Sequence, residues 1–241
     1  MMERFAKMGY EGIEFIDFRQ GEFISLDKLD PAREIRKKLD GLGLPCSGMH
    51  VQWNTLVNEL SKALDYNLEI GSPYIVLTRL PFDKRFDDNL PKACETIYGI
   101  AEQCKKNGIR LCFHNHDWSV VEHDGRCPLD TMFDIVPADL LSLQVEVFWI
   151  ECCGMDAVKF LYKYQDRIKS IHFTDKLNKV ELRHTELGRG IMDIKGIIDA
   201  SERIGLDWYN VEQEYCKGDM YASLEYDCKY LKKTLGRAGL Q

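Results

Sequence analysis

Two patterns of apolar and polar residues alternate along the chain. Short runs rich in β-branched and aromatic residues predict strands, and longer amphipathic stretches predict helices. Strands are predicted over residues 11–16, 44–51, 74–78, 109–114, 141–148, 168–173 and 208–211. Helices are predicted over residues 31–42, 54–70, 90–107, 129–136, 156–164, 194–204 and 223–235. The chain therefore reads as seven β-then-α units with no linker between them.

This alternation predicts an α/β fold with a parallel sheet, in one domain over residues 1–241. Asp30 is expected to cap the helix at 31–42, with Pro31 in its first position. Residues 75–77, Ile-Val-Leu, are apolar on both parities, as in a sheet covered on both faces. A parallel (β/α) TIM-type barrel fits this pattern. A doubly wound open sheet is the alternative, but no glycine-rich phosphate turn follows the first visible strand.

A closed barrel of this kind needs eight strands, and the pattern shows seven. Residues 5–9 read as the end of a first helix, and no strand precedes them. Bare strand edges invite pairing with other chains. We therefore expect another segment, a second copy in a homo-oligomer, or a partner subunit to cover the open seam.

Composition narrows the function classes. The 241 residues are 45% hydrophobic and 29% charged, as in a soluble globular protein, and the net charge is −7. That charge argues against nucleic acid as a partner, and no apolar run is long enough to span a membrane. The nine cysteines are irregularly spaced and are expected to be reduced thiols. We expect a cytoplasmic protein with a small-molecule substrate.

Polar side chains gather where the predicted strands end, which in a parallel barrel is the active-site rim. They are His50, His114, Asn115, His116, Asp117, Glu146, Trp149, His172, Asp175, Glu212 and Glu214. Histidine and carboxylate converging on one rim suit a divalent cation. Tryptophans beside polar groups, here Trp53, Trp118 and Trp149, suit a sugar with its apolar C–H faces.

Each residue also has a structural interpretation. His123 and His184 fall in polar loops and are expected to be solvated. Glu14 is interpreted as a charged residue with a structural role at the end of the barrel, and Glu214 as a charged residue at the rim that faces water. Glu146, His172 and Glu212 are harder to explain in that way. Each lies at or beside the end of an apolar strand, where an unpaired buried polar group costs roughly 2–7 kcal/mol. A shared cation would remove much of that cost.

Six segments, in order along nearly the whole chain, carry a family resemblance. Residues 113–117, Phe-His-Asn-His-Asp, resemble the "YHNHD" strand end of the sugar phosphate isomerase/epimerase family, the xylose isomerase-like barrels that include inosose dehydratase-like proteins. Residues 8–14 resemble its "GYegvE" segment, and 143–156 resemble "lqlDtyW…GxD". Residues 167–175, 186–193 and 211–214 are similar to "Ri..lHlKD", "ElGeGviD" and "vEqD".

The resemblance implies an eight-stranded barrel with a divalent metal, often manganese; Mg²⁺, Co²⁺ and Zn²⁺ are alternatives. Its four ligands would be His114, Glu146, His172 and Glu212. Many members have Glu in place of His114 and Asp in place of Glu146. Thr174 stands where many have a substrate-facing Lys, with Lys176 two residues later.

The expected chemistry is proton abstraction beside a carbonyl. Glu146 or Glu212 would take the proton, and the other carboxylate or His116 would return it, through an enediolate. Side chains expected to bind substrate are His50, Trp118, Trp149, Asp175 and Lys176. Protonation on the other face gives epimerisation, protonation of the neighbouring carbon gives isomerisation, and loss of a β-substituent gives a dehydratase or lyase. We favour a metal-dependent sugar isomerase/epimerase. A dehydratase or lyase on a keto-inositol or 3-keto-glycoside, and a non-catalytic sugar-binding barrel subunit, are the alternatives.

Overall fold

The computed structural model describes residues 1–19, 22–81, 89–122 and 124–236. The chain divides into two compact units, Met1–Leu143 and Gln144–Gln241. The division falls inside one strand, β7 (Leu141–Glu146), whose first three residues belong to unit 1 and last three to unit 2. Each unit is described by itself. The expectation of one domain stays a prediction.

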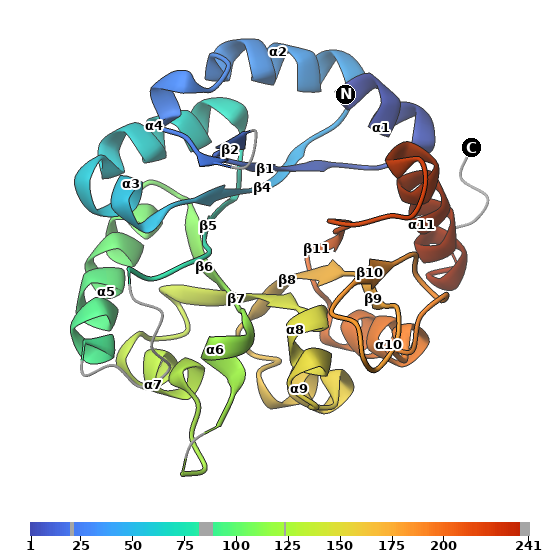
Figure 1. The fold of residues 1–241 in the computed structure, drawn as a ribbon. Helices are drawn as coiled ribbons and strands as arrows, with labels where there is room; N and C mark the ends of the chain where they lie inside the picture. Colours follow the sequence, from blue (N-terminus) through green and yellow to red (C-terminus); the bar gives the residue numbers. More distant parts are fainter. Residues whose placement is uncertain (20–21, 82–88, 123, 237–241) are drawn as a thin grey trace. The chain divides into compact units, whose positions relative to one another are not determined.

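Unit 1 carries four parallel strands before β7. They are β1 (Ile13–Ile16), β4 (Cys46–Val51), β5 (Tyr74–Leu77) and β6 (Arg110–His114), neighbours in that order. The helices are α1 (Met2–Met8), α2 (Ala32–Leu42), α3 (Trp53–Asn58), α4 (Leu60–Ile70), α5 (Leu90–Lys106), α6 (Asp117–Val120) and α7 (Pro128–Ile135). Two short strands, β2 (Phe18–Arg19) and β3 (Glu22–Phe23), pair with each other, and a 3-10 turn, η1, covers Leu26–Lys28. In Figure 1, α2 and α4 lie along the outer side of β1 and β4.

Unit 2 continues the sheet order from β7 through β8 (Ile168–Phe173) to β11 (Trp208–Val211). Its helices are α8 (Val147–Cys152), α9 (Ala157–Lys163), α10 (Ile194–Ile204) and α11 (Met220–Thr234). A small antiparallel hairpin, β9 (Asp175–Lys176) with β10 (His184–Thr185), follows β8 directly. In both units each sheet strand leads into a helix, which confirms the predicted α/β pattern of seven parallel strands.

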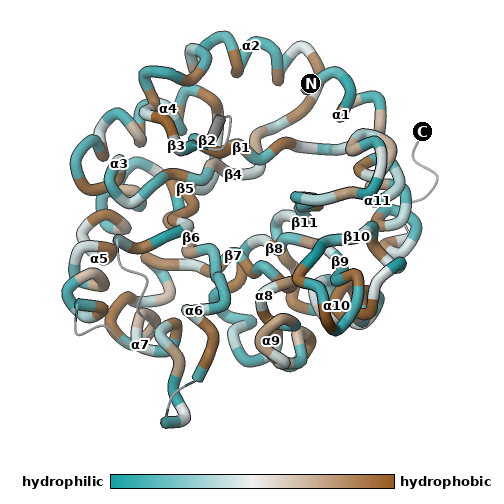
Figure 2. Tube along the Cα trace, viewed as in Figure 1, coloured by the Kyte–Doolittle hydropathy of each residue, from teal (hydrophilic) through white to brown (hydrophobic). Residues whose placement is uncertain are grey.

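The core lies between strands and helices. Every residue of β4, β5 and β7 is buried, so these strands are covered on both faces. The helices are amphipathic: α2 turns Ile35 and Leu39 inward, and Figure 2 shows hydrophilic and hydrophobic residues alternating along it. Burial of apolar side chains against the sheet is what holds such a layer together.

Two strands differ from the rest. In the described sheet, β1 has β4 as its one neighbour and β11 has β8. All four residues of β11 and three of the four in β1 are half-buried, and Ile16 is 44% exposed. By contrast, β4, β5 and β7 are buried throughout, and β6 and β8 each contain one half-buried residue. The expectation that a further segment, a second copy or a partner subunit covers these edges stays a prediction.

Several predicted boundaries were wrong: the last helix, for instance, begins at Met220 and not at Ser223. Three other errors have a clear cause in the structure. The helix expected at 54–70 is interrupted at Glu59, whose φ of −135° leaves the helical range, so it forms α3 and α4. Pro31, with φ −54° and ψ 130°, is itself the N-cap residue of α2, and Asp30 lies outside the helix. The strand expected at 141–148 ends at Glu146, because the Glu146 side chain caps α8 by accepting a hydrogen bond from the Phe148 N–H.

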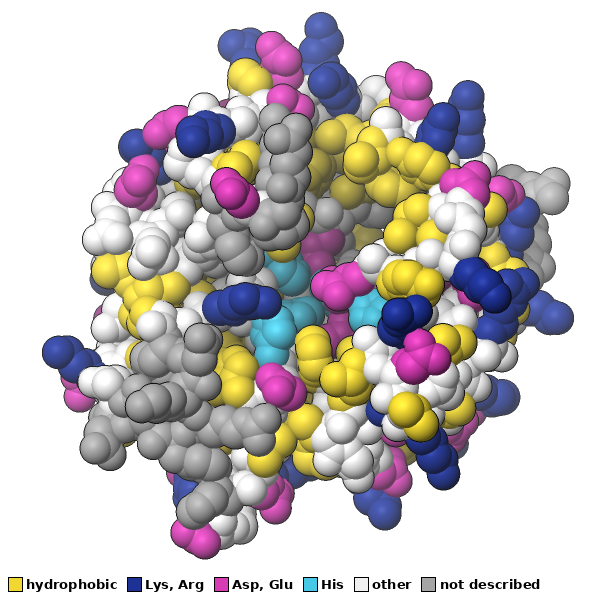
Figure 3. Space-filling view, in the orientation of Figure 1, with side chains coloured by type: hydrophobic (Ala, Val, Ile, Leu, Met, Phe, Trp, Pro, Cys, Tyr) yellow, Lys and Arg dark blue, Asp and Glu magenta, His cyan; other side chains and the backbone are white. Residues whose placement is uncertain are grey.

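The state of the cysteines, the apolarity of the helices and the surface charge were compared with the sequence. All nine cysteines are free thiols. Within the described ranges, no helix has the length and apolarity needed to cross a bilayer. Figure 3 shows basic and acidic side chains interspersed on the visible face, as expected for a modest net charge without a basic tract.

Candidate metal centre

Three predicted site residues of unit 2 come together at the ends of neighbouring strands. Glu146 is the last residue of β7, His172 lies near the end of β8, and Glu212 follows β11 directly. Parallel pairing places Asn210 beside His172 and Val211 beside Phe173, and the Glu212 N–H donates to the Phe173 carbonyl. The sheet register therefore brings residues far apart in sequence to one place.

The three side chains meet at one imidazole nitrogen. His172 Nδ1 lies 2.8 Å from Glu212 Oε2 and 3.6 Å from Glu146 Oε2. The Glu146 side chain is 2% exposed and that of His172 is 5% exposed, whereas that of Glu212 is 31% exposed. One carboxylate is therefore sealed in the core and the other faces partly outward.

Burial dominates the electrostatics of this cluster. Removal of Glu146 from water raises the pKa of its carboxyl well above the ordinary value, and the negative charge of Glu212 raises it further. His172 and the Phe148 N–H act in the opposite direction. Two carboxylates beside one imidazole are stable only if a proton or a cation lies between them.

The donor set fits a divalent cation. Each of the three residues offers one ligand atom, and these atoms lie within 4.8 Å of one another. Ligands about 2.1 Å from a tetrahedral ion are roughly 3.4 Å apart, close to the 3.6 Å separation of His172 Nδ1 and Glu146 Oε2. The 2.8 Å separation of His172 and Glu212 is that of a hydrogen bond, and would have to open by about half an ångström. A His/Glu cluster that can hold a metal is present.

The hairpin beside this cluster holds a histidine that the sequence interpretation placed in solvent. His184 is 7% exposed, so that expectation was wrong. Its Nδ1 accepts a hydrogen bond from the Glu214 N–H at 3.1 Å, and its ring packs edge-on against Phe148, with centroids 4.4 Å apart. Phe148, in the first turn of α8, and the Glu214 backbone donor bury it, and neither contact is visible in the local sequence. The residue named with it, His123, lies outside the described residues.

Asp175, expected to bind substrate, is fully buried, and its carboxylate accepts hydrogen bonds from the backbone. Its two carboxylate oxygens accept hydrogen bonds from four N–H groups, those of Lys176, Gly188, Gly190 and Met192. This carboxylate fixes the segment that follows β10, a role the sequence interpretation missed. Contact of Asp175 with substrate stays a prediction. Lys176 is 7% exposed and contacts the thiol of Cys152.

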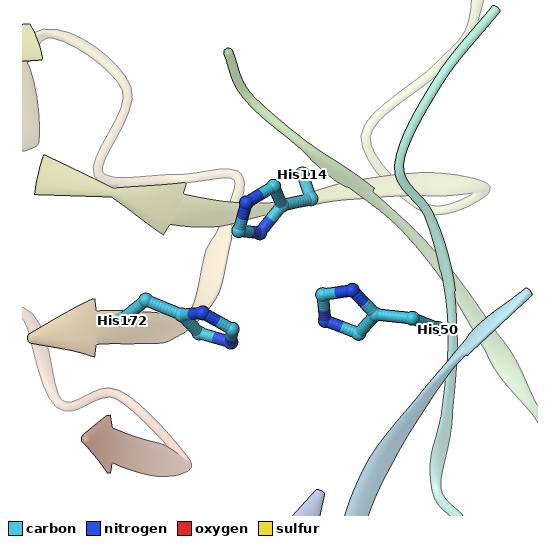
Figure 4. A group of neighbouring side chains, drawn as sticks. All are labelled: His50, His114 and His172. Carbon is cyan, nitrogen blue, oxygen red and sulfur yellow. The ribbon is translucent and has the colours of Figure 1, made fainter. Parts of the chain in front are cut away.

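Unit 1 contains its own polar cluster at the ends of β4 and β6. His50 Nε2 lies 3.1 Å from Glu14 Oε2, and the His50 and His114 rings have centroids 5.1 Å apart (Figure 4). His114 in turn lies 5.1 Å from the ring of His116. Glu14 lies over Gly48: a Cβ there would be 2.8 Å from its carboxylate oxygen. The sequence interpretation treated Glu14 as a structural charge and missed its contact with His50.

The predicted aromatic residues lie at half-buried positions. Trp118, in α6, meets Phe113 edge-on at 5.9 Å, and Trp149, in α8, meets Phe148 at 5.4 Å. The prediction for Trp149 required the strand to end before it, and β7 does end at Glu146. Glu214, expected at the rim, has a side chain 71% exposed.

Comparison with known proteins agrees with this arrangement. A family described as xylose isomerase-like TIM barrel matches residues 2–234. The chain belongs to the xylose isomerase-like TIM barrel family. The predicted fold class, a parallel (β/α) barrel with seven visible strands, is thereby confirmed, and so is the resemblance noted in the sequence.

Individual relatives of this xylose isomerase-like chain are distant. It is 24% identical over 168 residues to an inosose dehydratase of Lacticaseibacillus casei, covering 62% of this chain and 56% of that protein. It thus spans little more than half of that curated relative. A sugar phosphate isomerase/epimerase structure from Parabacteroides distasonis has a TM-score of 0.79 at 22% identity, covering 99% of this chain and 87% of the other. The structure of IolI protein with a bound zinc atom has a TM-score of 0.76 at 14% identity, covering 100% and 93%.

Proposed function

We propose that this protein is a divalent-metal-dependent enzyme that moves a proton beside the carbonyl of a ketose or keto-polyol. The observation that carries the proposal is the position of His172 Nδ1 between the carboxylates of Glu146 and Glu212. A scaffold protein has no need of two carboxylates around one imidazole. Such a set costs stability unless something positively charged occupies it.

Glu146, His172 and Glu212 are the residues of unit 2 that would hold the cation. His114 is the fourth ligand that the sequence predicts, and it stays a prediction. Imidazole with carboxylate suits Mn²⁺, Zn²⁺, Co²⁺ or Mg²⁺, and we expect manganese. The IolI structure, which has a similar fold, contains a bound zinc atom, and this supports our proposal of a metal. When bound, the cation would polarise a substrate carbonyl and acidify the adjacent C–H.

The chain's own side chains would then move the proton. Glu212, whose side chain is 31% exposed, has the access to substrate that a base requires, whereas Glu146 is held in the core by the Phe148 N–H. Glu146 or His116 would return the proton. Trp149 and Trp118 would contact the apolar faces of a sugar, and His50, Lys176 and Asp175 its polar groups.

Return of the proton to the other face, or to the neighbouring carbon, makes the protein an epimerase or isomerase, which we favour. A second candidate is a dehydratase, in which the α-proton leaves and hydroxide departs from the β-carbon as water. The inosose dehydratases among the curated relatives favour it.

A substrate screen with manganese present tests the proposal. Ketoses, inososes and 3-keto-glycosides should be incubated with the metal-loaded protein and the products resolved by NMR. An isomerase or epimerase gives a product of equal mass, and a dehydratase gives an enone that lacks one water. Manganese-independent turnover, or no turnover of any class with the metal bound, would count against the proposal.

A further inference from the structure

Five large apolar side chains of unit 2 are exposed on and beside the β9–β10 hairpin. Val180, in the loop of the hairpin, is 89% exposed, and Leu182 is 63% exposed. The five residues, together called the hairpin surface, are Leu177, Val180, Leu182, Ile191 and Tyr215. Figure 3 shows hydrophobic side chains between charged ones over the area that β9 and β10 occupy in Figure 1. Exposed apolar residues that are scattered singly need no explanation, whereas a group of them indicates an interaction surface.

Contacts between three segments bring these residues into one area. The Ile191 N–H donates to the carbonyl of Lys176, the residue before Leu177, at 2.9 Å. The Arg183 guanidinium lies over the Tyr215 ring, 5.0 Å from its centroid. The hairpin is therefore the common neighbour of the other two segments, and the exposed apolar side chains belong to one surface of unit 2.

The loop of the hairpin is held in shape by its own hydrogen bonds. The Leu177 N–H donates to the Arg183 carbonyl at 3.0 Å and closes the loop. Inside it, the side-chain oxygen of Asn178 accepts hydrogen bonds from the N–H groups of Val180 and Glu181, each at 2.8 Å. The Asn178 Nδ2 donates to the Glu181 carboxylate at 3.1 Å. A loop that is already ordered loses little conformational entropy on association, so more of the free energy gained by burying its apolar side chains remains for binding.

The charges in the loop favour a second copy of this chain as the partner. Lys179 and Glu181 have opposite charges and stand on either side of Val180 in the sequence. In an interface with two-fold symmetry, residue i contacts residue j of the other copy, and j contacts i. A two-fold axis at Val180 would bring the two valines together and place Lys179 of each copy against Glu181 of the other. A partner with charges of one sign would instead meet a like charge in the loop, which opposes binding.

We infer that the hairpin surface is a self-association interface, in which the hairpins of two copies meet around a two-fold axis at Val180. The five residues of the surface are not among those proposed to hold the metal or the substrate, so the inference is independent of the proposed function. An interface built mainly from one hairpin of each copy is at the small end of the range, below about 1,200 Å² in total. We therefore expect a weak dimer, with a Kd in the micromolar range.

Sedimentation velocity over a range of protein concentrations tests the interface. The wild-type protein should pass from monomer to dimer as its concentration rises. Val180→Asp places two carboxylates at the axis and should weaken the dimer at least about tenfold, because like charges that face each other across an interface repel. Val57→Asp is the matched control: Val57 is 45% exposed on α3 of unit 1, and the same substitution there should leave the dimer unchanged.

Two charge reversals test the two-fold arrangement itself. Lys179→Glu leaves acidic residues on both sides of Val180, and Glu181→Lys leaves basic residues on both sides. Each variant alone should dimerise at least about tenfold more weakly than the wild type, because like charges then face each other. An equimolar mixture of the two variants should recover association as a heterodimer, because an acidic loop then faces a basic one.

Three results would overturn the inference: a wild-type protein that stays monomeric at every concentration, a dimer that is unaffected by Val180→Asp, or a mixture of the charge-reversal variants that stays monomeric. Circular dichroism of each variant separates loss of the interface from loss of the fold. If Val180→Asp unfolds, the mixture of the two charge-reversal variants gives the answer. A dimer that survives Val180→Asp would belong to another surface of the protein, and the hairpin surface would lose its assigned role.

Discussion

The Nδ1 atom of His172 lies 2.8 Å from Oε2 of Glu212, in a pairing that the register of β8 and β11 imposes. Glu146 approaches the same nitrogen from β7 at 3.6 Å. In the absence of a cation, this geometry requires a proton between His172 Nδ1 and Glu212 Oε2. A cation would replace that proton, so metal binding should release it and should tighten as pH rises.

The first prediction concerns the ligands. Glu146→Gln removes one anionic ligand and should weaken Mn²⁺ binding by at least about tenfold, since even outer partners of metal ligands are worth 10- to 100-fold. His172→Ala should have at least as large an effect, and His114→Ala tests the predicted fourth ligand. Electron paramagnetic resonance of free Mn²⁺ measures the affinity directly.

Glu225→Gln is the matched control for these variants. Glu225 lies on the surface of α11, paired with Lys229, and its loss should leave the Mn²⁺ affinity unchanged. Equal affinity in Glu146→Gln and in the control would remove Glu146 from the ligand set.

Substitution of Trp149 distinguishes a role in substrate binding from a role in packing. The side chain is half-buried at the start of α8, and we expect it to form an aromatic wall for substrate. Trp149→Ala should weaken polyol binding by more than it lowers the free energy of unfolding, both expressed in kcal/mol. Calorimetry and urea denaturation give the two numbers. Equal losses would indicate that Trp149 is a packing residue.

The segment after β10 depends on a glycine at position 190. A Cβ on Gly190 would lie 2.2 Å from the Lys176 carbonyl and 2.3 Å from Asp175 Oδ1, a collision with backbone and with a buried carboxylate. Gly190→Ala should therefore destabilise the fold by about 2 kcal/mol or more, as overpacked sites do.

Gly41→Ala is the control for Gly190→Ala. Gly41 lies in α2 with nothing within 4 Å of a Cβ, and the substitution should be neutral or stabilising by up to about 1 kcal/mol. The free energies of unfolding in urea compare the two. Similar values for both variants would show that the segment adapts freely and that Asp175 does not hold it.

Asp227 makes stability depend on pH. It is fully buried on α11, and burial is the main cause that raises its pKa to about 7. The negative charge of Glu186 raises the pKa further, whereas the hydrogen bond from the Leu187 N–H and the positive charge of Arg189 lower it. Asp175 also faces it. In the unfolded chain the group loses its proton near pH 4. The native state therefore holds a proton that the unfolded state lacks between about pH 4 and 7, and this stabilising contribution is lost as pH rises through that window.

Asp227→Asn should remove this dependence. At about 1.4 kcal/mol per pH unit, the variant should gain up to about 4 kcal/mol over the wild type at pH 8 and nothing near pH 4. Asn can still accept the Leu187 N–H bond that Asp227 accepts at 2.7 Å. Urea denaturation at pH 4, 6 and 8 measures the slope. A parallel pH profile for the two proteins would refute the assignment.

The sequence predicts the sheet strands well and the residues that support the site poorly, for a physical reason. Strand runs such as 75–77 are apolar on both parities, and that pattern depends only on local burial. Glu146, His172 and Glu212 could be selected because carboxylate and imidazole follow apolar runs, where charge is costly.

The roles of Glu14, Asp175 and His184 depend on contacts between segments that are distant in sequence. Asp175 meets N–H groups 13–17 residues later, and His184 meets the backbone 30 residues later. No local pattern distinguishes them from solvated loop residues. The break at Glu59 was hidden because α3 and α4 bury the same kinds of apolar side chain, Leu56 before it and Ala63 and Leu64 after it.

The central claim, proton transfer beside a carbonyl, is tested most directly by solvent exchange. The manganese-loaded protein should be incubated in deuterated water with the substrate found in the screen, and the recovered substrate and product analysed by NMR. We predict deuterium at one carbon of an otherwise intact skeleton, loss of this signal in Glu212→Gln and His172→Ala, and full signal in Glu225→Gln. Turnover without solvent deuterium and without dependence on metal would contradict the mechanism and require hydride transfer or nucleophilic attack in its place.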